Sequence, residues 1–171
     1  MPNTPLLSVK NLHISFVSKA KTSPVVQNLS LELYPNEILG IVGESGSGKS
    51  VSSLAVLGLL PKKDVLLEGN VTFENQELLR LSEKEFRKLR GRDISLIFQE
   101  PMSALNPSMT CGVQVQEILL QHTKKSRKEA KAAVLQLFEK VKLPRAAAMY
   151  NQYPHQISGG QKQRVMIAMA I

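Results

Sequence analysis

Residues 43–50, Gly-Glu-Ser-Gly-Ser-Gly-Lys-Ser, have the types and spacing of a loop that binds phosphate, G-x-x-x-x-G-K-[ST]. The glycines let the backbone pass close to an anion, so that successive N–H groups point toward it. Lys49 is expected to reach the β- and γ-phosphates of a nucleotide, and Ser50 to ligate Mg²⁺. The alternative, a turn that only caps a helix, does not explain the Lys-Ser pair. The residues expected to contact the nucleotide here are Gly43, Glu44, Ser45, Gly46, Ser47, Gly48, Lys49, Ser50 and Val51.

The segments on either side of this loop supply the geometry that it needs. Residues 38–42, Ile-Leu-Gly-Ile-Val, form a short apolar run that predicts a buried strand. Residues 51–60 are an apolar segment that predicts a helix, and Pro61 would end it. A strand, a glycine-rich turn and a helix in this order indicate an α/β core that binds a nucleotide.

A second group of residues near the end of the chain, Ile-Ser-Gly-Gly-Gln at 157–161, is also suited to an anion. Ser158 can cap a helix that begins near Gly160 or Gln161. Two adjacent glycines before a helix cost stability, which is understandable if a ligand must approach the backbone closely. The free N–H groups of a helix N-terminus, together with a serine hydroxyl, form an anion site. The alternative is a helix N-cap made flexible by its glycines, with no ligand bound to it.

Composition sets broad limits on the function. The 171 residues are enough for one domain with a core, and 43% hydrophobic and 21% charged residues are ordinary for a globular protein. No apolar run approaches the ~20 residues that span a bilayer, and residues 1–5 lack signal-peptide features. Cys111 alone excludes an internal disulfide and suits a reducing compartment. The net charge of +8, much of it within residues 124–142, is compatible with nucleic acid, anionic lipid headgroups or nucleotide phosphates.

Strands are predicted on both sides of the loop segment. Alternating apolar residues indicate antiparallel strands over residues 6–16 and 25–33, and a strand pair or bent strand over residues 65–75. Ser82 and Glu85 have the spacing of a capping box, which predicts that a short helix begins there.

The second half of the chain adds one more predicted strand and then helices. Residues 93–98 predict the strand, and Gln99 stands at its C-terminal end, the edge at which parallel α/β sheets bind ligands. Gln99 is therefore placed to meet the metal of the nucleotide or a water. Helices are predicted over residues 113–121 and 126–140, followed by short helical pieces. Residues 101–157 are interpreted as a helical subdomain inserted into the α/β core.

Taken together, these motifs resemble the ATP-binding subunits of ABC transporters over essentially the whole chain. The amino-acid sequences of residues 40–50, 98–107 and 153–156 resemble those of the dipeptide/oligopeptide/nickel importer branch. The resemblance implies an α/β fold: a P-loop NTPase (RecA-like) core with an antiparallel β subdomain and an inserted helical subdomain, incomplete at the C-terminus. The expected parts are residues 1–100, the β subdomain and core; residues 101–157, the helical subdomain; and residues 158–171, the signature motif and the start of the following helix.

The resemblance also implies roles for single residues. Phe16 matches the aromatic residue that stacks on adenine, with Val26 or Val25 as a second apolar contact. The alternative for Phe16 is an inward-facing strand residue. Gln99 matches the glutamine that touches Mg²⁺ or the attacking water, and it is expected to be catalytic together with Lys49. The signature residues would reach the γ-phosphate of ATP held by the opposite subunit of a head-to-tail dimer; they are Ser158, Gly159, Gly160 and Gln161.

The implied cofactors and partners follow from the same resemblance. ATP and Mg²⁺ would be bound, and the second ATP-binding subunit would be identical or different. Integral membrane permease subunits would dock on the helical subdomain, and an external solute-binding protein would act indirectly. The protein is therefore expected in the cytoplasm, peripheral to the inner face of the cell membrane, where it drives uptake of peptides or a related solute. No nucleic acid partner is expected.

Some features of the family pattern differ or have no counterpart. Ile157 stands where leucine is usual, and Asn36 where glycine is common. No Walker B aspartate, catalytic glutamate or switch histidine follows the signature up to Ile171. The chain is therefore expected to be the N-terminal portion of a longer subunit, either a fragment or a truncated gene product. It is expected to bind nucleotide weakly and, alone, not to hydrolyse ATP at family-like rates. Two alternatives stay open: a soluble non-transport ABC ATPase, and a non-enzymatic interaction fragment.

Overall fold

The computed structural model describes residues 4–18, 21–98 and 104–171. The chain divides into two compact units, Met1–Arg87 and Lys88–Ile171. We call the first the sheet unit and the second the helical unit, and we describe each one separately.

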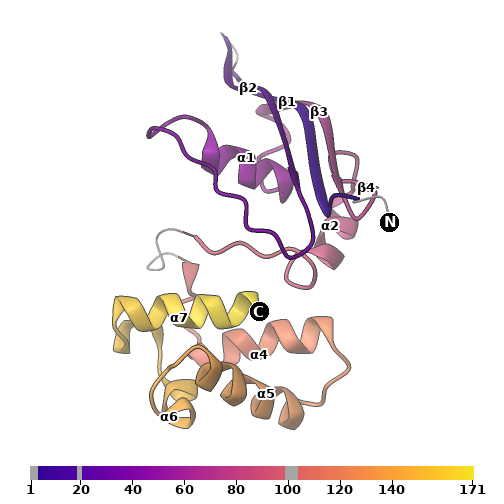
Figure 1. The fold of residues 1–171 in the computed structure, drawn as a ribbon. Helices are drawn as coiled ribbons and strands as arrows, with labels where there is room; N and C mark the ends of the chain where they lie inside the picture. The colour runs from indigo at the N-terminus through magenta and orange to yellow at the C-terminus, as the bar shows by residue number, and fades with distance from the viewer. Residues whose placement is uncertain (1–3, 19–20, 99–103) are drawn as a thin grey trace. The chain divides into compact units, whose positions relative to one another are not determined.

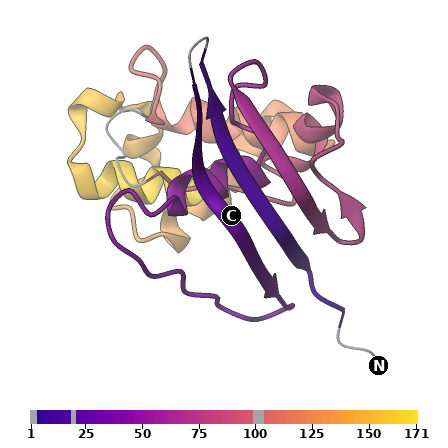
Figure 2. The same cartoon turned by 90° about the horizontal axis from the view of Figure 1, so that it is seen from above.

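The sheet unit is built on a four-stranded antiparallel sheet with the strand order β2-β1-β3-β4. Figure 2 shows the three long strands side by side. Apolar side chains that alternate along β1 and β3 form the core, and Leu12, Ile14 and Val71 are fully buried. The strands are β1 (Leu7–Val17), β2 (Thr22–Leu33), β3 (Val65–Phe73) and β4 (Gln76–Glu77).

Two short helices complete the sheet unit, α1 (Lys49–Val56) and α2 (Glu83–Leu89) (Figure 1). Gly58, which follows α1, lies so close to Phe86 of α2 that a β-carbon there would come within 2.5 Å of the ring. Gly58 also has a φ of +60°. The close approach of the two helices therefore depends on a residue without a side chain.

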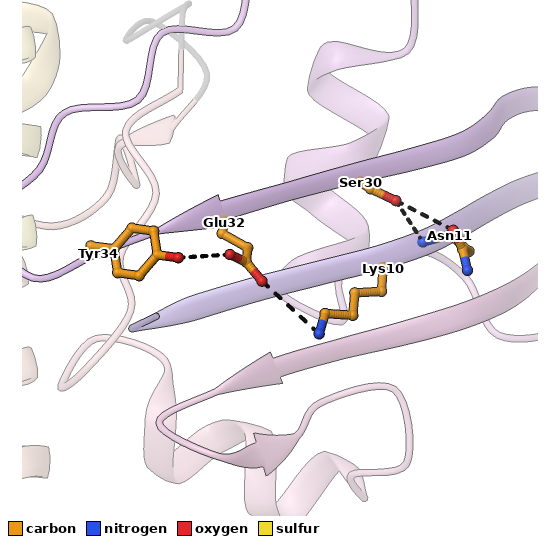
Figure 3. A network of polar contacts seen from close by, with 5 residues as sticks. All are labelled: Lys10, Asn11, Ser30, Glu32 and Tyr34. Carbon is orange, nitrogen blue, oxygen red and sulfur yellow. Dashed lines mark hydrogen bonds and ion pairs between the residues drawn. The ribbon is translucent and has the colours of Figure 1, made fainter. Parts of the chain in front are cut away.

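An irregularity in β1 gives one face of the sheet a polar network (Figure 3). Asn11 has a φ of 50°, and the register of β1 against both neighbours shifts around it. The Asn11 N–H donates to the Ser30 hydroxyl at 2.9 Å, and the Tyr34 hydroxyl donates to Glu32 at 2.8 Å. Lys10 pairs with the same carboxylate at 4.0 Å. Because Lys10, Asn11, Ser30 and Glu32 are exposed, the network stabilises the fold only slightly.

In its described residues, the helical unit packs four helices and one 3₁₀ turn around its own core. The helices are α4 (Cys111–His122), α5 (Arg127–Lys140), α6 (Ala146–Asn151) and α7 (Gly159–Ala170), and the 3₁₀ turn is η1 (Pro154–Gln156). Phe138 is fully buried at the centre, and burial raises the pKa of the Cys111 thiol to about 11. The core residues are Leu105, Cys111, Val115, Val134, Phe138, Leu143, Met149, Tyr150, Ile157, Val165, Met166 and Ala168.

Most of the predicted elements are confirmed. The antiparallel strands lie within a residue or a few of their predicted bounds, and the helices predicted over residues 113–121 and 126–140 are α4 and α5. The predicted capping box is present, since the Glu85 N–H bonds to the Ser82 hydroxyl and the Ser82 N–H to the Glu85 carboxylate. The helix predicted over residues 51–60 is shorter, because it ends at Val56.

Two predicted strands, residues 38–42 and 93–98, are wrong. Both segments have irregular backbone; Ile94 makes only one isolated bridge, to Arg90. Their apolar side chains are not buried either, since Ile38 is 98% and Val42 96% exposed. A central parallel strand forms when neighbours on both sides take its backbone hydrogen bonds. In the described residues neither segment has such a neighbour.

Within the described part of the chain, the helices are too short or too polar for any of them to cross a bilayer.

Candidate functional site

The glycine-rich loop lies in the sheet unit, between the irregular segment 38–42 and α1. Gly46 and Gly48 have φ angles of +82° and +88°, a region that residues with a β-carbon adopt only with strain. The Ser47 N–H donates to the Glu44 carbonyl at 3.2 Å and closes a turn. The loop thus has the tight, left-handed backbone that its glycines predict.

Lys49 holds the loop together from inside. Its Nζ donates to the carbonyl oxygens of Gly43 at 2.6 Å and Glu44 at 2.7 Å, and to the Ser47 hydroxyl at 3.1 Å. The ammonium is therefore folded back over the loop and lies only 3.8 Å from where a β-carbon of Gly43 would be. A charge in this position is within reach of any anion that the loop binds.

Gly48 is the point at which the loop rests on the sheet. A β-carbon there would come within 2.7 Å of the Val26 side chain and 3.3 Å of the Val25 carbonyl oxygen. Val26 is buried, and its pairing with Ile14 places it in the middle of the β1–β2 ladder. The glycine-rich loop is thus seated directly on β2.

The start of α1 offers backbone donors without a competing side chain. Its N-cap is Gly48, which supplies no side-chain cap, and the described first turn contains no acidic residue. Ser50 is exposed beside these N–H groups. The N-terminus of a helix carries partial positive charge and free N–H groups, so this end of α1 fits a phosphate group. Ser50 fits the hydroxyl that would ligate Mg²⁺.

The second motif begins α7 in the helical unit. Ser158 is the N-cap, and it forms a capping box with Gln161: the Gln161 N–H donates to the Ser158 hydroxyl at 3.3 Å, and the Ser158 N–H to the Gln161 side-chain oxygen at 2.9 Å. Gly159 and Gly160 are exposed, and a β-carbon at either would meet no described atom within 4 Å. Internal packing therefore does not require these glycines, which suits a backbone that a ligand approaches.

The remaining predicted site residues are less fully defined. Phe16 is half-buried near the end of β1, opposite Ser23 of β2. Val25 is half-buried, whereas Val26 is covered by Gly48, so Val25 is the more accessible of the two. Gln99 lies outside the described residues. The structure thus brings Val26 to the glycine-rich loop, and the signature residues belong to the other unit.

Sequence reasoning missed two residues that position the motifs. The Ser52 hydroxyl is buried and donates to the Gly48 carbonyl at 3.0 Å, which fixes the end of the loop onto α1. A serine four residues after the last loop glycine, in a helix, is a local signal for this bond. Arg164 of α7 donates to the Val141 carbonyl at 2.7 Å and to the Lys142 carbonyl at 3.3 Å. It ties α7 to the end of α5, 22 and 23 residues away.

Comparison with known proteins gives consistent results. A family model described as ABC transporter matches residues 26–171. A dipeptide transport ATP-binding protein, DppD of Bacillus subtilis, is 49% identical over 167 residues, which are 97% of this chain and 50% of that protein. An oligopeptide transport ATP-binding protein of the same organism, OppD, is 44% identical and covers 98% of this chain and 47% of its own length. The chain thus spans about half the length of these relatives.

A solved structure agrees with these relatives. It is a dimer of the ATP-binding cassette MJ0796 in a post-hydrolysis state, bound to ADP and Pi. It superposes with a TM-score of 0.83 at 28% identity, covering 96% of this chain and 68% of that one.

Proposed function

Because this chain belongs to the ABC transporter family, we propose that it is the ATP-binding part of an importer that takes up peptides or a related solute. The observation that carries the proposal is the loop of residues 43–50, with left-handed glycines, an inward ammonium and an uncapped helix start. The peptide substrate is inferred from the relatives, which are named for dipeptide and oligopeptide transport.

The loop residues would act on the nucleotide by position and charge. Lys49 would exchange its present carbonyl partners for the β- and γ-phosphates, since it is already directed into the loop. The N–H groups at the start of α1 would donate to phosphate oxygens. Ser50 would hold Mg²⁺, which when bound neutralises the phosphate charge, and Gln99 would be its second contact. Phe16, with Val25 or Val26, would stack against the adenine.

We propose that two such chains, or this chain and a related one, bind ATP in a head-to-tail pair. Support comes from the start of α7, where Gly159 and Gly160 are exposed and their N–H groups would form a second anion site that the first loop does not need. The solved relative MJ0796 is itself described as a dimer bound to ADP and Pi. Permease subunits, and indirectly an external solute-binding protein, would be the further partners. The protein would then work at the inner face of the cell membrane.

The 171-residue chain alone is proposed to turn ATP over slowly. Its sequence contains no Asp-Glu pair after an apolar run, so it lacks a carboxylate in the position of a general base. A steady-state phosphate-release assay tests this. Turnover at rates typical of enzymes, ~1 s⁻¹ or more, that disappears in Lys49→Ala would contradict it.

The direct test of nucleotide binding is the effect of Mg-ATP on thermal unfolding, measured for the chain and for Lys49→Ala. At about one hundred times its Kd, a ligand stabilises the folded state by ~2.7 kcal/mol, so Tm should rise by several degrees. Lys49→Ala should lose most of this rise. Lys62→Ala, which removes an exposed lysine beyond α1, is the matched control and should keep it. Equal rises in both variants would refute the assignment of the loop.

A second prediction separates the structural role of Ser158 from its proposed role in ATP binding. Ser158 and Ser126 cap α7 and α5 through the same kind of capping box. Replacing either one by alanine should cost about 1 kcal/mol of stability. Only Ser158→Ala should also reduce ATP-dependent dimerisation, as measured by sedimentation in the presence of Mg-ATP. If Ser126→Ala reduced dimerisation equally, the effect would be one of stability alone.

A further inference from the structure

The net charge of the protein lies entirely in one of its two units. The sheet unit, residues 1–87, has nine lysines and arginines and nine carboxylates, so its formal charge is zero. The helical unit, residues 88–171, has thirteen lysines and arginines against five carboxylates, so it carries the whole +8. A one-sided distribution of this kind generates a local positive potential that acts on anionic partners.

The charge is densest in the turn between α4 and α5. We call Lys124, Lys125, Arg127 and Lys128 the basic turn; all four side chains are exposed. Figure 1 shows this turn at the end of the helical unit remote from α6 and from the start of α7. The basic turn is therefore separate from the second motif of the proposed ATP site.

Helix α5 would be more stable without these cations. They stand at its N-terminus, where the helix dipole is positive and acidic residues are favoured. Glu129 is the one acidic residue of the first turn, and hydrogen bonds from the Ser126 hydroxyl and N–H lower the pKa of its carboxyl group. Among the described residues, none of the four cations forms an ion pair with a carboxylate. The fold thus leaves the charge of the basic turn available to a partner.

The basic turn is also held in a defined backbone conformation. The Gln116 side chain donates to the Arg127 carbonyl at 2.6 Å, and the Tyr150 hydroxyl donates to Gln116 at 2.5 Å. At the other end, the Thr123 hydroxyl donates to the Leu119 carbonyl at 2.6 Å and accepts from the Lys125 N–H at 3.3 Å. Little backbone entropy would be lost when the cations bind a partner.

We propose that the basic turn binds the headgroups of anionic phospholipids and so holds the helical unit against a membrane surface. The inference rests on the proposed function, because an importer subunit works beside a membrane. Lipid fits better than a single-stranded nucleic acid, because single strands are bound on exposed aromatic platforms. In the described part of the helical unit, Phe138 and Tyr150 are buried, and the exposed aromatic residues, Phe98 and Tyr153, lie outside α4, α5 and the basic turn. Clustered lysines, by contrast, are the usual means of attraction to an anionic leaflet.

The test is flotation of the 171-residue chain with phosphatidylcholine vesicles, prepared with and without phosphatidylglycerol, in the absence of nucleotide. The chain should bind only the anionic vesicles, and added salt should weaken the binding. Neutralising the whole basic turn to glutamine (K124Q, K125Q, R127Q, K128Q) should lower the partition coefficient about a hundredfold or more. The double variant Lys124→Gln, Lys125→Gln changes only residues that precede α5, so its folding should be unchanged. Its partition coefficient should fall about tenfold.

The matched control removes four exposed lysines from the sheet unit (K21Q, K62Q, K63Q, K84Q), which lowers the net charge by the same amount. It should retain most of the vesicle binding. Equal losses in both quadruple variants, or no binding of the parent chain to anionic vesicles, would overturn the proposal. Tighter binding to duplex DNA than to vesicles at the same salt concentration would overturn it in favour of nucleic acid. Lys49→Ala should bind vesicles normally, so failure of the ATP assignment would leave this result unchanged.

Discussion

Gly48→Ala is expected to destabilise the sheet unit by about 2–4 kcal/mol and to remove the thermal stabilisation by Mg-ATP. An alanine at this position would be strained by the left-handed φ of +88°. Its methyl group would also come within 2.7 Å of the buried Val26 side chain. The backbone must then shift away from β2, and it carries the start of α1 and Lys49 with it. Urea unfolding gives the loss of stability, and thermal unfolding with and without Mg-ATP gives the loss of binding.

Gly46→Ala is the matched control for this substitution. Gly46 has a similar φ of +82°, but a β-carbon there would meet no described atom within 4 Å. It should therefore show only the cost of backbone strain, about 1–2 kcal/mol. Val26→Ala combined with Gly48→Ala should recover part of the stability, because it removes the methyl groups that clash. The packing argument fails if Gly48→Ala is no more destabilising than Gly46→Ala, or if the double variant is additive.

The contact between Gly48 and Val26 changes how Val26 is understood. The family resemblance suggests that Val26 or Val25 contacts the adenine, and the structure shows Val26 buried beneath the glycine-rich loop. Its first physical role is to support the loop. A residue of this kind influences the nucleotide through the position of Lys49 and Ser50, so its replacement should change stability and binding together.

What could be predicted from the sequence is what depends on neighbours along the chain. The caps at Ser82 and Ser158 each bond to a residue three positions away, so residue type and spacing are enough to identify them. The left-handed turn of the glycine-rich loop is equally local. Helices α4 and α5 follow from apolar spacing for the same reason.

What could not be predicted depends on residues far away along the chain. The apolar run at residues 38–42 reads as a strand, but a strand exists only when another strand accepts its hydrogen bonds. The described residues provide no such partner, and Ile38 and Val42 are exposed. The hydrogen bonds of Arg164 to the end of α5 likewise follow from how the helices pack, which no local pattern indicates.

Gly112→Ala is expected to destabilise the helical unit by about 3 kcal/mol, because overpacking a buried site forces side chains to move. A β-carbon at Gly112 in α4 would lie 2.1 Å from the Tyr150 ring of α6. The ring would have to leave its place, and its hydroxyl would lose the 2.5 Å bond to Gln116. The ammonium of Lys131, 4.8 Å from the ring centroid, would lose that contact as well. Chemical denaturation monitored by circular dichroism measures the loss.

Gly160→Ala shows why this cost arises from packing and not from the glycine itself. Both glycines lie near the start of a helix, but the Gly160 site is exposed and has no described atom within 4 Å of an added β-carbon. Alanine is the better helix former by up to about 1 kcal/mol, so Gly160→Ala should leave stability unchanged or raise it slightly. Opposite signs at the two sites are therefore the expected result. If Gly112→Ala were as well tolerated as Gly160→Ala, Tyr150 would not pack tightly on α4. Its hydrogen bond to Gln116 would then not hold the backbone of the basic turn in place.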